Sequence, residues 1–155
     1  MHIVIIEDDV IFASKISKKL DKNMYTTKVY NDAKTFYQTN GKFDTDLYIV
    51  DIKLSDDTGF NVIKHIRNVN KEYTPIIIMS GFNDTENKVY GLDISADDYI
   101  SKPVPPAELL ARIRSLIRRH NKIEATNEIK DKDIVYNLTT KKVLLKGEDI
   151  RLPKK

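Results

Sequence analysis

The stretch Leu47-Tyr48-Ile49-Val50-Asp51 is a short apolar run that ends in a single acid. Three further runs have the same form, an apolar segment followed by polar residues: Ile3-Val4-Ile5-Ile6 before Glu7 and Asp8, Ile76-Ile77-Ile78-Met79 before Ser80, and Tyr99-Ile100 shortly before Lys102. Apolar runs of this length without polar alternation are typical of parallel strands that are buried on both faces. The sequence therefore predicts an α/β fold.

Segments with helical apolar spacing separate these runs. The sequence predicts strands over about 2–6, 26–30, 47–51, 75–80 and 98–101, and helices over about 10–22, 33–39, 60–66, 84–92 and 105–119. This alternation amounts to five βα units. In an open parallel sheet, ligands bind beyond the carboxyl ends of the strands, and the polar residues named above all lie at such ends. That edge of the sheet is the candidate site.

The C-terminal part of the chain has a different pattern. Residues 121–131 are charged and lose apolar periodicity, which predicts a linker between a first domain over 1–120 and a second region over 132–155. In that second region apolar residues alternate with polar ones, and the turn signals at 137–140 and 146–147 divide it into three short segments. We expect a three-stranded antiparallel meander there.

Composition narrows the class of protein. The net charge is +3, and residues 120–155 carry all of that excess, with 9 Lys and Arg against 6 Asp and Glu. A solvated polar surface explains so mild an excess better than nucleic-acid binding does. The chain has no cysteine, no apolar stretch near the roughly 20 residues of a membrane span, and a strand in place of a signal peptide. We therefore expect a soluble, cytoplasmic protein without a membrane partner.

The predicted edge of the sheet gathers three carboxylates, those of Glu7, Asp8 and Asp51. Like charges held close together raise one another's pKa values unless a cation compensates. Oxygen ligands without clustered His or Cys favour Mg²⁺ or Mn²⁺ over zinc, and Mg²⁺ commonly leaves positions for phosphate oxygens. Lys102 could pair with a phosphoryl oxygen, and the hydroxyl of Ser80 could donate to another. Asp51 ends its strand alone, which makes it the better candidate for a nucleophile.

These residues lie within motifs that resemble the receiver domain of bacterial two-component response regulators, over about residues 1–120. The motifs are Ile5-Ile6-Glu7-Asp8-Asp9, Val50-Asp51-Ile52 followed by Gly59-Phe60, Ser80-Gly81, and Ala96-Asp97-Asp98-Tyr99-Ile100-Ser101-Lys102-Pro103. The resemblance implies a doubly wound, five-stranded parallel sheet of order 2-1-3-4-5. It also implies a signalling domain, not an enzyme with turnover, that accepts a phosphoryl group on Asp51 from the phosphohistidine of a sensor histidine kinase.

The resemblance assigns metal ligands position by position. Asp8 and Asp51 would bind Mg²⁺ directly, together with the main-chain carbonyl of Lys53, and Glu7 would act through a bound water. Asp9 matches none of these ligands and is expected to cap the first helix.

The remaining matched positions concern the phosphoryl group and the switch. Ser80 and Lys102 would bind the phosphoryl oxygens, and the bond before Pro103 would be cis. A phosphoryl group on Asp51 would draw Ser80 toward it, and Tyr99 would then rotate inward.

Within the family, the segments 90–93, 96–99 and 108–114 resemble the OmpR/PhoB branch, whose members form homodimers through the fourth helix, fifth strand and fifth helix. The resemblance places five charged residues on that dimer face: Lys88, Asp97, Asp98, Glu108 and Arg112. Residues 135–137 and 142–152 resemble the strands that open the winged-helix DNA-binding domain of this branch. We expect a truncated start of that domain, with promoter DNA bound and transcription regulated only by a full-length parent.

Two other functions fit part of the pattern. A Mg²⁺-dependent phosphohydrolase with an aspartyl intermediate would use the same carboxylates, but such enzymes commonly have a second acid two residues after the nucleophile, where this chain has Lys53. A phosphorylation-independent interaction module would need only the dimer face. The intact set of acids, Ser80 and Lys102 argues against that alternative.

Overall fold

The computed structural model describes residues 1–39, 44–69, 73–81, 89–91, 93–131, 134–137, 142–145 and 148–151, with side chains up to Asn121. The chain divides into two compact units, Met1–Leu116 and Ile117–Lys155. In the described part of the chain, no helix combines the length and the apolar character needed to cross a bilayer.

The first unit contains a five-stranded parallel sheet. Its strands are β1 (His2–Ile6), β2 (Thr26–Tyr30), β3 (Leu47–Asp51), β4 (Ile76–Ser80) and β5 (Asp98–Ser101). Their order is β2-β1-β3-β4-β5, and each neighbouring pair is parallel. The predicted fold class and strand order are therefore confirmed.

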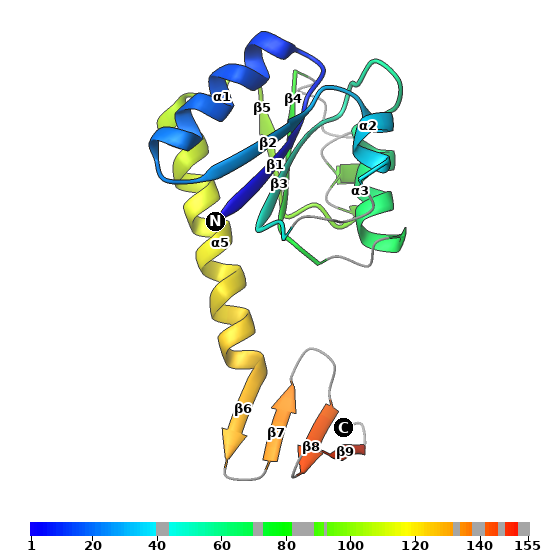
Figure 1. Cartoon of the computed structure of the whole chain (residues 1–155), viewed down its shortest axis with the longest axis vertical. Coiled ribbons are helices and arrows are strands. Elements are labelled where there is room, and N and C mark those ends of the chain that lie inside the picture. The colour runs from blue at the N-terminus through cyan, green and yellow to red at the C-terminus, as the bar shows by residue number, and fades with distance from the viewer. Residues whose placement is uncertain are drawn as a thin grey trace. The chain divides into compact units, whose positions relative to one another are not determined.

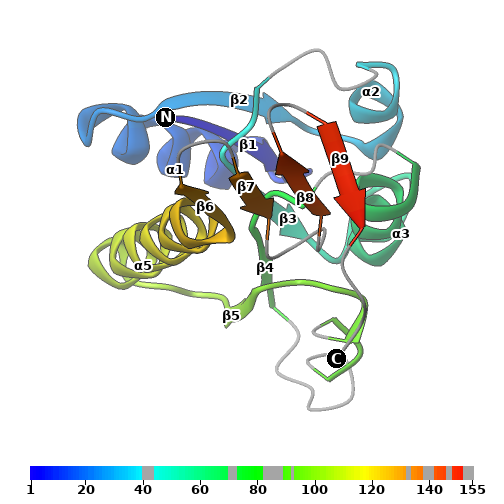
Figure 2. The ribbon, with the colours of Figure 1, turned by 90° about the horizontal axis from the view of Figure 1, so that it is seen from below.

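Helices cover both faces of this sheet (Figures 1 and 2). The start of α5 (Pro106–Asn127) lies with α1 (Val10–Lys22) on one side, and α2 (Ala33–Tyr37) lies with α3 (Gly59–Lys64) on the other. A π-helix, η1 (His65–Val69), continues α3. Of the helix predicted over 84–92, residues 89–91 are helical, whereas 84–88 and 92 lie outside the described residues.

Burial on both faces explains why the strands are continuous apolar runs. All five residues of β3 and all five of β4 are buried. The helices begin at side chains that accept a backbone hydrogen bond in the first turn, which satisfies donors that have no partner inside the helix. Asp9 caps α1 as predicted, Asp32 caps α2, and Thr58 caps α3.

The second unit contains an antiparallel sheet of four strands, not the three predicted. The strands are β6 (Glu128–Asp131), β7 (Ile134–Asn137), β8 (Lys142–Leu145) and β9 (Glu148–Arg151), in sequential order. The segment 121–131, predicted as a linker, has regular local structure: α5 continues to Asn127 and β6 follows directly. Adding residues to the end of α5 avoids the free-energy cost of nucleating a new helix. The strand β6 has a single apolar residue, so its structure depends on pairing with β7.

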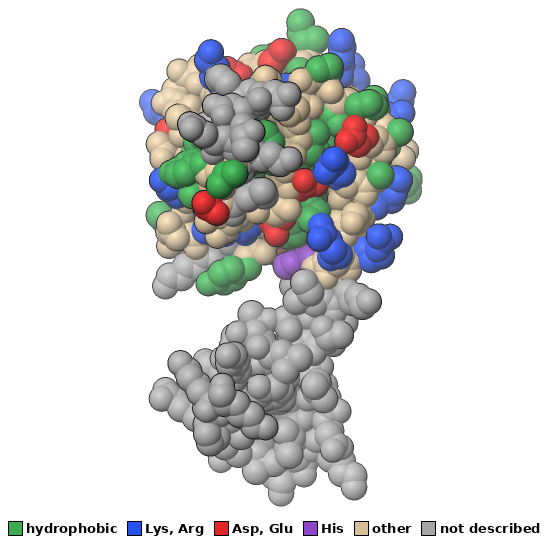
Figure 3. Space-filling model, turned by 180° about the vertical axis from the view of Figure 1, so that it is seen from behind, with side chains coloured by type: hydrophobic (Ala, Val, Ile, Leu, Met, Phe, Trp, Pro, Cys, Tyr) green, Lys and Arg blue, Asp and Glu red, His purple; other side chains and the backbone are tan. Residues whose placement is uncertain are grey.

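Charged side chains of both signs lie among one another on the face of the first unit seen in Figure 3. This arrangement agrees with the balance of acids and bases outside the C-terminal segment.

Candidate functional site

Backbone pairing brings the predicted site residues to one edge of the parallel sheet. Because Ile6 pairs with Val50, Glu7 after β1 lies beside Asp51 at the end of β3. Asp51 in turn pairs with Met79, directly before Ser80. The backbone N–H of Lys102, which follows β5, donates to the carbonyl oxygen of Ser80 at 2.8 Å. This hydrogen bond places Lys102 beside the end of β4.

Three carboxylates converge at this edge. Glu7, Asp8 and Asp51 each offer an oxygen, and these atoms all lie within 4.8 Å of one another. Glu7 and Asp51 are buried, at 3% and 7% exposure, and Asp8 is half-buried. So compact a set of oxygen donors suits a hard divalent cation such as Mg²⁺.

Lys102 supplies the positive charge of the cluster. Its Nζ forms an ion pair with Oε1 of Glu7 and lies 3.5 Å from Oδ2 of Asp51. The same ammonium lies over the ring of Phe12, 4.4 Å from the ring centroid, which is the geometry of a cation–π contact. Phe12 belongs to the first turn of α1. Nothing in the sequence around it indicated a contact with Lys102.

Burial dominates the electrostatics of Glu7. Loss of hydration raises the pKa of its carboxyl group to about 8, the neighbouring Asp51 adds to the increase, and Lys102 opposes it. The Oε2 atom of Glu7 is buried and has no hydrogen-bond partner among the residues that the structure describes. A polar atom in that state is costly, and a cation or an ordered water at the cluster would satisfy it.

The backbone at Gly59 is packed tightly against the end of β3. The N–H of Gly59 donates to the carbonyl oxygen of Ile52 at 2.6 Å, and Lys53 forms a bridge with Thr58. A Cβ at position 59 would lie 2.2 Å from the backbone oxygen of Asp51. Only glycine allows this approach, which keeps the loop carrying Lys53 close to the carboxylates.

Two acids of the same loop fasten it to α2. The carboxylate of Asp56 accepts from the backbone N–H groups of Ala33 and Lys34, each at 2.9 Å. The carboxylate of Asp57 accepts from the hydroxyl of Tyr37 at 2.8 Å. Burial and Asp57 raise the pKa of Tyr37, so its hydroxyl stays protonated and can donate.

The predicted switch residues are both buried. Ser80 is 1% exposed. Tyr99 is 6% exposed and belongs to the hydrophobic core cluster of the first unit. The ring of Tyr99 is therefore already in the inward position in this structure. The peptide bond between Lys102 and Pro103 is cis, as the resemblance implied.

The residues predicted for a dimer face form ion pairs within the chain. Arg112 pairs with Asp98 at 3.0 Å and with Glu108 at 3.1 Å. Asp97 pairs with Arg67 at 3.0 Å and also accepts from the backbone N–H of Ile76 at 2.8 Å. Lys88 lies outside the described residues.

Comparison with known proteins identifies the class. The family model of the response regulator receiver domain matches residues 3–114, so the chain belongs to this family. Receiver domains of this family are signalling domains of two-component systems.

Particular relatives extend the likeness beyond the receiver. The probable transcriptional regulatory protein SilR of Salmonella typhimurium is 34% identical over 155 residues, covering 100% of this chain and 68% of that protein. The cell cycle response regulator CtrA of Brucella anthropi is 37% identical, covering 98% of this chain and 65% of that protein. The chain thus spans about two thirds of the length of these curated relatives.

Solved structures agree with the fold. A two-component response regulator from Clostridium difficile superposes with a TM-score of 0.74 at 27% identity, covering 78% of this chain and 98% of that one. DrrB of Thermotoga maritima, described as an OmpR/PhoB homolog, gives a TM-score of 0.68 at 28% identity, covering 98% of this chain and 66% of that one. An OmpR/PhoB-like receiver is the type of domain that these relatives indicate.

Proposed function

We propose that Asp51 accepts a phosphoryl group from the phosphohistidine of a sensor histidine kinase in a reaction that needs Mg²⁺. The supporting observation is the convergence of three carboxylates within 4.8 Å, with the ammonium of Lys102 3.5 Å from Asp51. This combination offers both a cation site and a charge partner for a phosphoryl oxygen at a single buried acid.

The oxygen donors of the chain fit Mg²⁺ better than a softer metal, because neither His nor Cys belongs to the cluster. Asp8, Asp51 and the main-chain carbonyl of Lys53 would hold the ion directly, and Glu7 would do so through a water. When bound, Mg²⁺ neutralises charge on the carboxylates and on the phosphoryl oxygens.

The residues of the chain divide the chemistry among them. An Oδ atom of Asp51 forms a bond to phosphorus as the bond from phosphorus to the kinase histidine breaks, and the electron pair of that bond returns to the imidazole. Lys102 moves from Asp51 and Glu7 to a phosphoryl oxygen, and the hydroxyl of Ser80 donates to another. Burial of Asp51 limits access of water to the acyl phosphate.

The output follows from the charge that this reaction adds. A phosphoryl group attracts Ser80 and holds Tyr99 in its buried position, which favours a homodimer through helix 4, strand 5 and helix 5. Asp98, Glu108 and Arg112 would exchange their present partners for those of a second chain. The region 132–155 resembles the strands that open a winged-helix domain, and the similarity to SilR, a probable transcriptional regulatory protein, supports binding of promoter DNA and regulation of transcription in the cytoplasm as the output.

A small phosphodonor provides the direct test. The chain is incubated with acetyl phosphate and Mg²⁺, and intact mass is measured alongside sedimentation velocity. We expect the mass to increase by one phosphoryl group and the sedimentation coefficient to rise. Asp51→Asn and removal of Mg²⁺ with a chelator should each abolish the mass increase. Phosphorylation that persists in Asp51→Asn would refute the assignment of the acceptor.

A further inference from the structure

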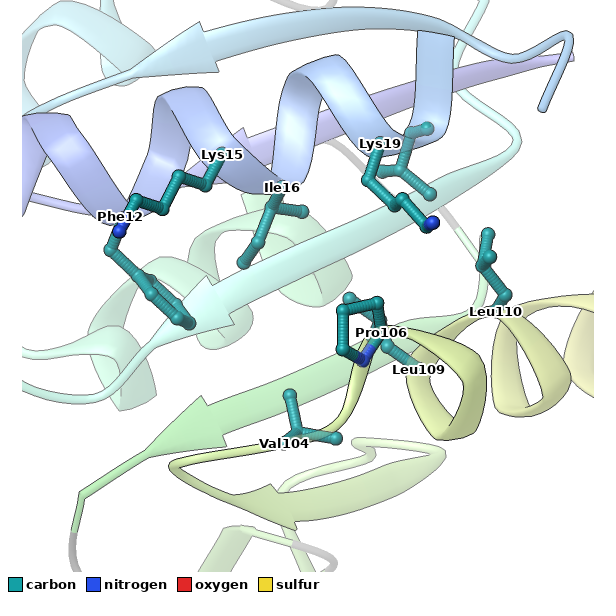
Figure 4. A pocket seen from close by; sticks show the side chains of 9 residues that line it. Phe12, Lys15, Ile16, Lys19, Val104, Pro106, Leu109 and Leu110 are labelled. Atoms are coloured by element: carbon teal, nitrogen blue, oxygen red, sulfur yellow. The ribbon is translucent and has the colours of Figure 1, made fainter. Parts of the chain in front are cut away.

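A pocket lies between α1 and the segment that leads into α5, and Phe12 is one of the residues that line it (Figure 4). Its volume is about 290 Å³, near the lower end of the roughly 300–1,000 Å³ typical of small-molecule sites. Its walls are mostly apolar, and its lining includes Phe12, Ile16 and Leu20 from one side and Val104, Leu109 and Leu110 from the other. A pocket of this size suits a small ligand with an apolar body.

Two lysines give the pocket a charge preference. Lys15 and Lys19 stand one helical turn apart on α1 and both line it, and the side chain of Lys19 extends toward Leu110 (Figure 4). Both are exposed, so their ammonium groups can stay hydrated while their methylene stems cover the apolar wall. Among the described residues that line the pocket none is acidic. The complementary ligand carries one negative charge at the end of an apolar body.

Phe12 connects this pocket with the acceptor site. One part of its ring lines the pocket, and the ring also lies 4.4 Å from Nζ of Lys102. The same ammonium pairs with Glu7 and approaches Asp51. A ligand that fills the pocket would hold the ring in place and with it the ammonium. Lys102 would then be less free to move to an incoming phosphoryl oxygen.

We propose that the pocket between α1 and α5 binds a small carboxylate with an apolar body, and that its occupancy slows phosphorylation of Asp51 through Phe12 and Lys102. The proposed binding of the carboxylate is inferred only from the shape and lining of the pocket. The effect on the rate rests on the proposed function of Asp51.

Binding is tested by adding octanoate, below its micelle concentration, to the ¹⁵N-labelled full chain and following amide signals by NMR. We expect saturable shifts in α1 and at residues 104–110, and a weaker response to octanol, which lacks the charge. The double variant Lys15→Gln with Lys19→Gln should lose about fivefold in affinity, from about two- to threefold for each exposed ion pair. The matched control changes Lys18 and Lys22, which are exposed on the same helix and do not line the pocket. It should bind as the unaltered chain does.

The outcomes separate the two parts of the proposal. Absence of saturable shifts at the pocket, or equal losses in the two double variants, would overturn the binding site. With binding established, saturating octanoate should slow phosphorylation by acetyl phosphate at least twofold, and an unchanged rate would overturn the link through Phe12. A chain that acetyl phosphate never modifies would refute the function of Asp51, while the NMR titration would still decide the binding site.

Discussion

Replacing Gly59 with alanine should distort the backbone at the end of β3. The added Cβ would lie 2.2 Å from the carbonyl oxygen of Asp51, 2.8 Å from its carbonyl carbon and 2.9 Å from Cα of Ile52. Carbon atoms in favourable contact are about 3.5–4.0 Å apart, so the two backbone segments must separate by roughly 1 Å. That movement also lengthens the hydrogen bond from the N–H of Gly59 to the carbonyl oxygen of Ile52, which is 2.6 Å.

The free energy of unfolding should therefore fall by about 3 kcal/mol. Overpacking typically costs about 1–3 kcal/mol, and a backbone neighbour cannot rotate away as a side chain can. Weakening one hydrogen bond adds about 1 kcal/mol, and the lower entropy of the unfolded alanine chain returns about 0.4–1 kcal/mol. At about 4 °C for each kcal/mol, the melting temperature should drop by roughly 12 °C.

Two other glycines provide graded controls in urea denaturation followed by circular dichroism. A Cβ on Gly81 meets no atom of the described residues within 4 Å, so Gly81→Ala should stay within about 0.5 kcal/mol of the unaltered chain. A Cβ on Gly91 would lie 2.7 Å from Cδ1 of Ile78, a side-chain end that can rotate, so Gly91→Ala should cost about 1 kcal/mol. The reasoning fails if Gly59→Ala is no less stable than Gly81→Ala.

Three further changes test interactions around α2 and η1. Asp56→Ala removes the acceptor of two backbone N–H groups in the first turn of α2, and should cost about 1–2 kcal/mol and speed amide hydrogen exchange there. Burial lowers the pKa of His65, so the unfolded chain takes up the proton first and stability should fall as pH drops below about 6.5. In His65→Gln this part of the pH dependence should vanish from denaturation curves. Arg67→Met should cost about 3 kcal/mol in the same assay, because the guanidinium bonds the carbonyls of Thr74 and Ser95 and the carboxylate of Asp97; a loss below 1 kcal/mol would contradict that estimate.

The parallel sheet and the positions of the site residues could be predicted because both depend on local sequence patterns. Apolar runs define strands that are buried on both faces, and parallel pairing then puts the residues after each run at the same edge. The pattern of apolar runs alone was enough to predict that Asp51, Ser80 and Lys102 lie at that edge. The register of the structure agrees with that reasoning strand by strand.

Features that depend on tertiary contacts could not be predicted in this way. The contact of Phe12 with Lys102 joins residues far apart in sequence, and an aromatic residue in a helical pattern is usually part of the core. The hydrogen bonds of Asp56 to α2 likewise depend on where the loop lies after folding. The extension of α5 beyond Arg119 and the strand β6 escaped prediction because the segment 120–131 carries no apolar pattern of its own.

The two acids that fasten the loop after β3 to α2 have a mechanical consequence. Asp56 and Asp57 together hold both ends of this five-residue helix, one through its first backbone N–H groups and the other through the hydroxyl of Tyr37. If the loop shifts, these hydrogen bonds must break or the helix must travel with it. A protein that binds α2 would thus restrain the backbone next to Asp51 without contacting that residue.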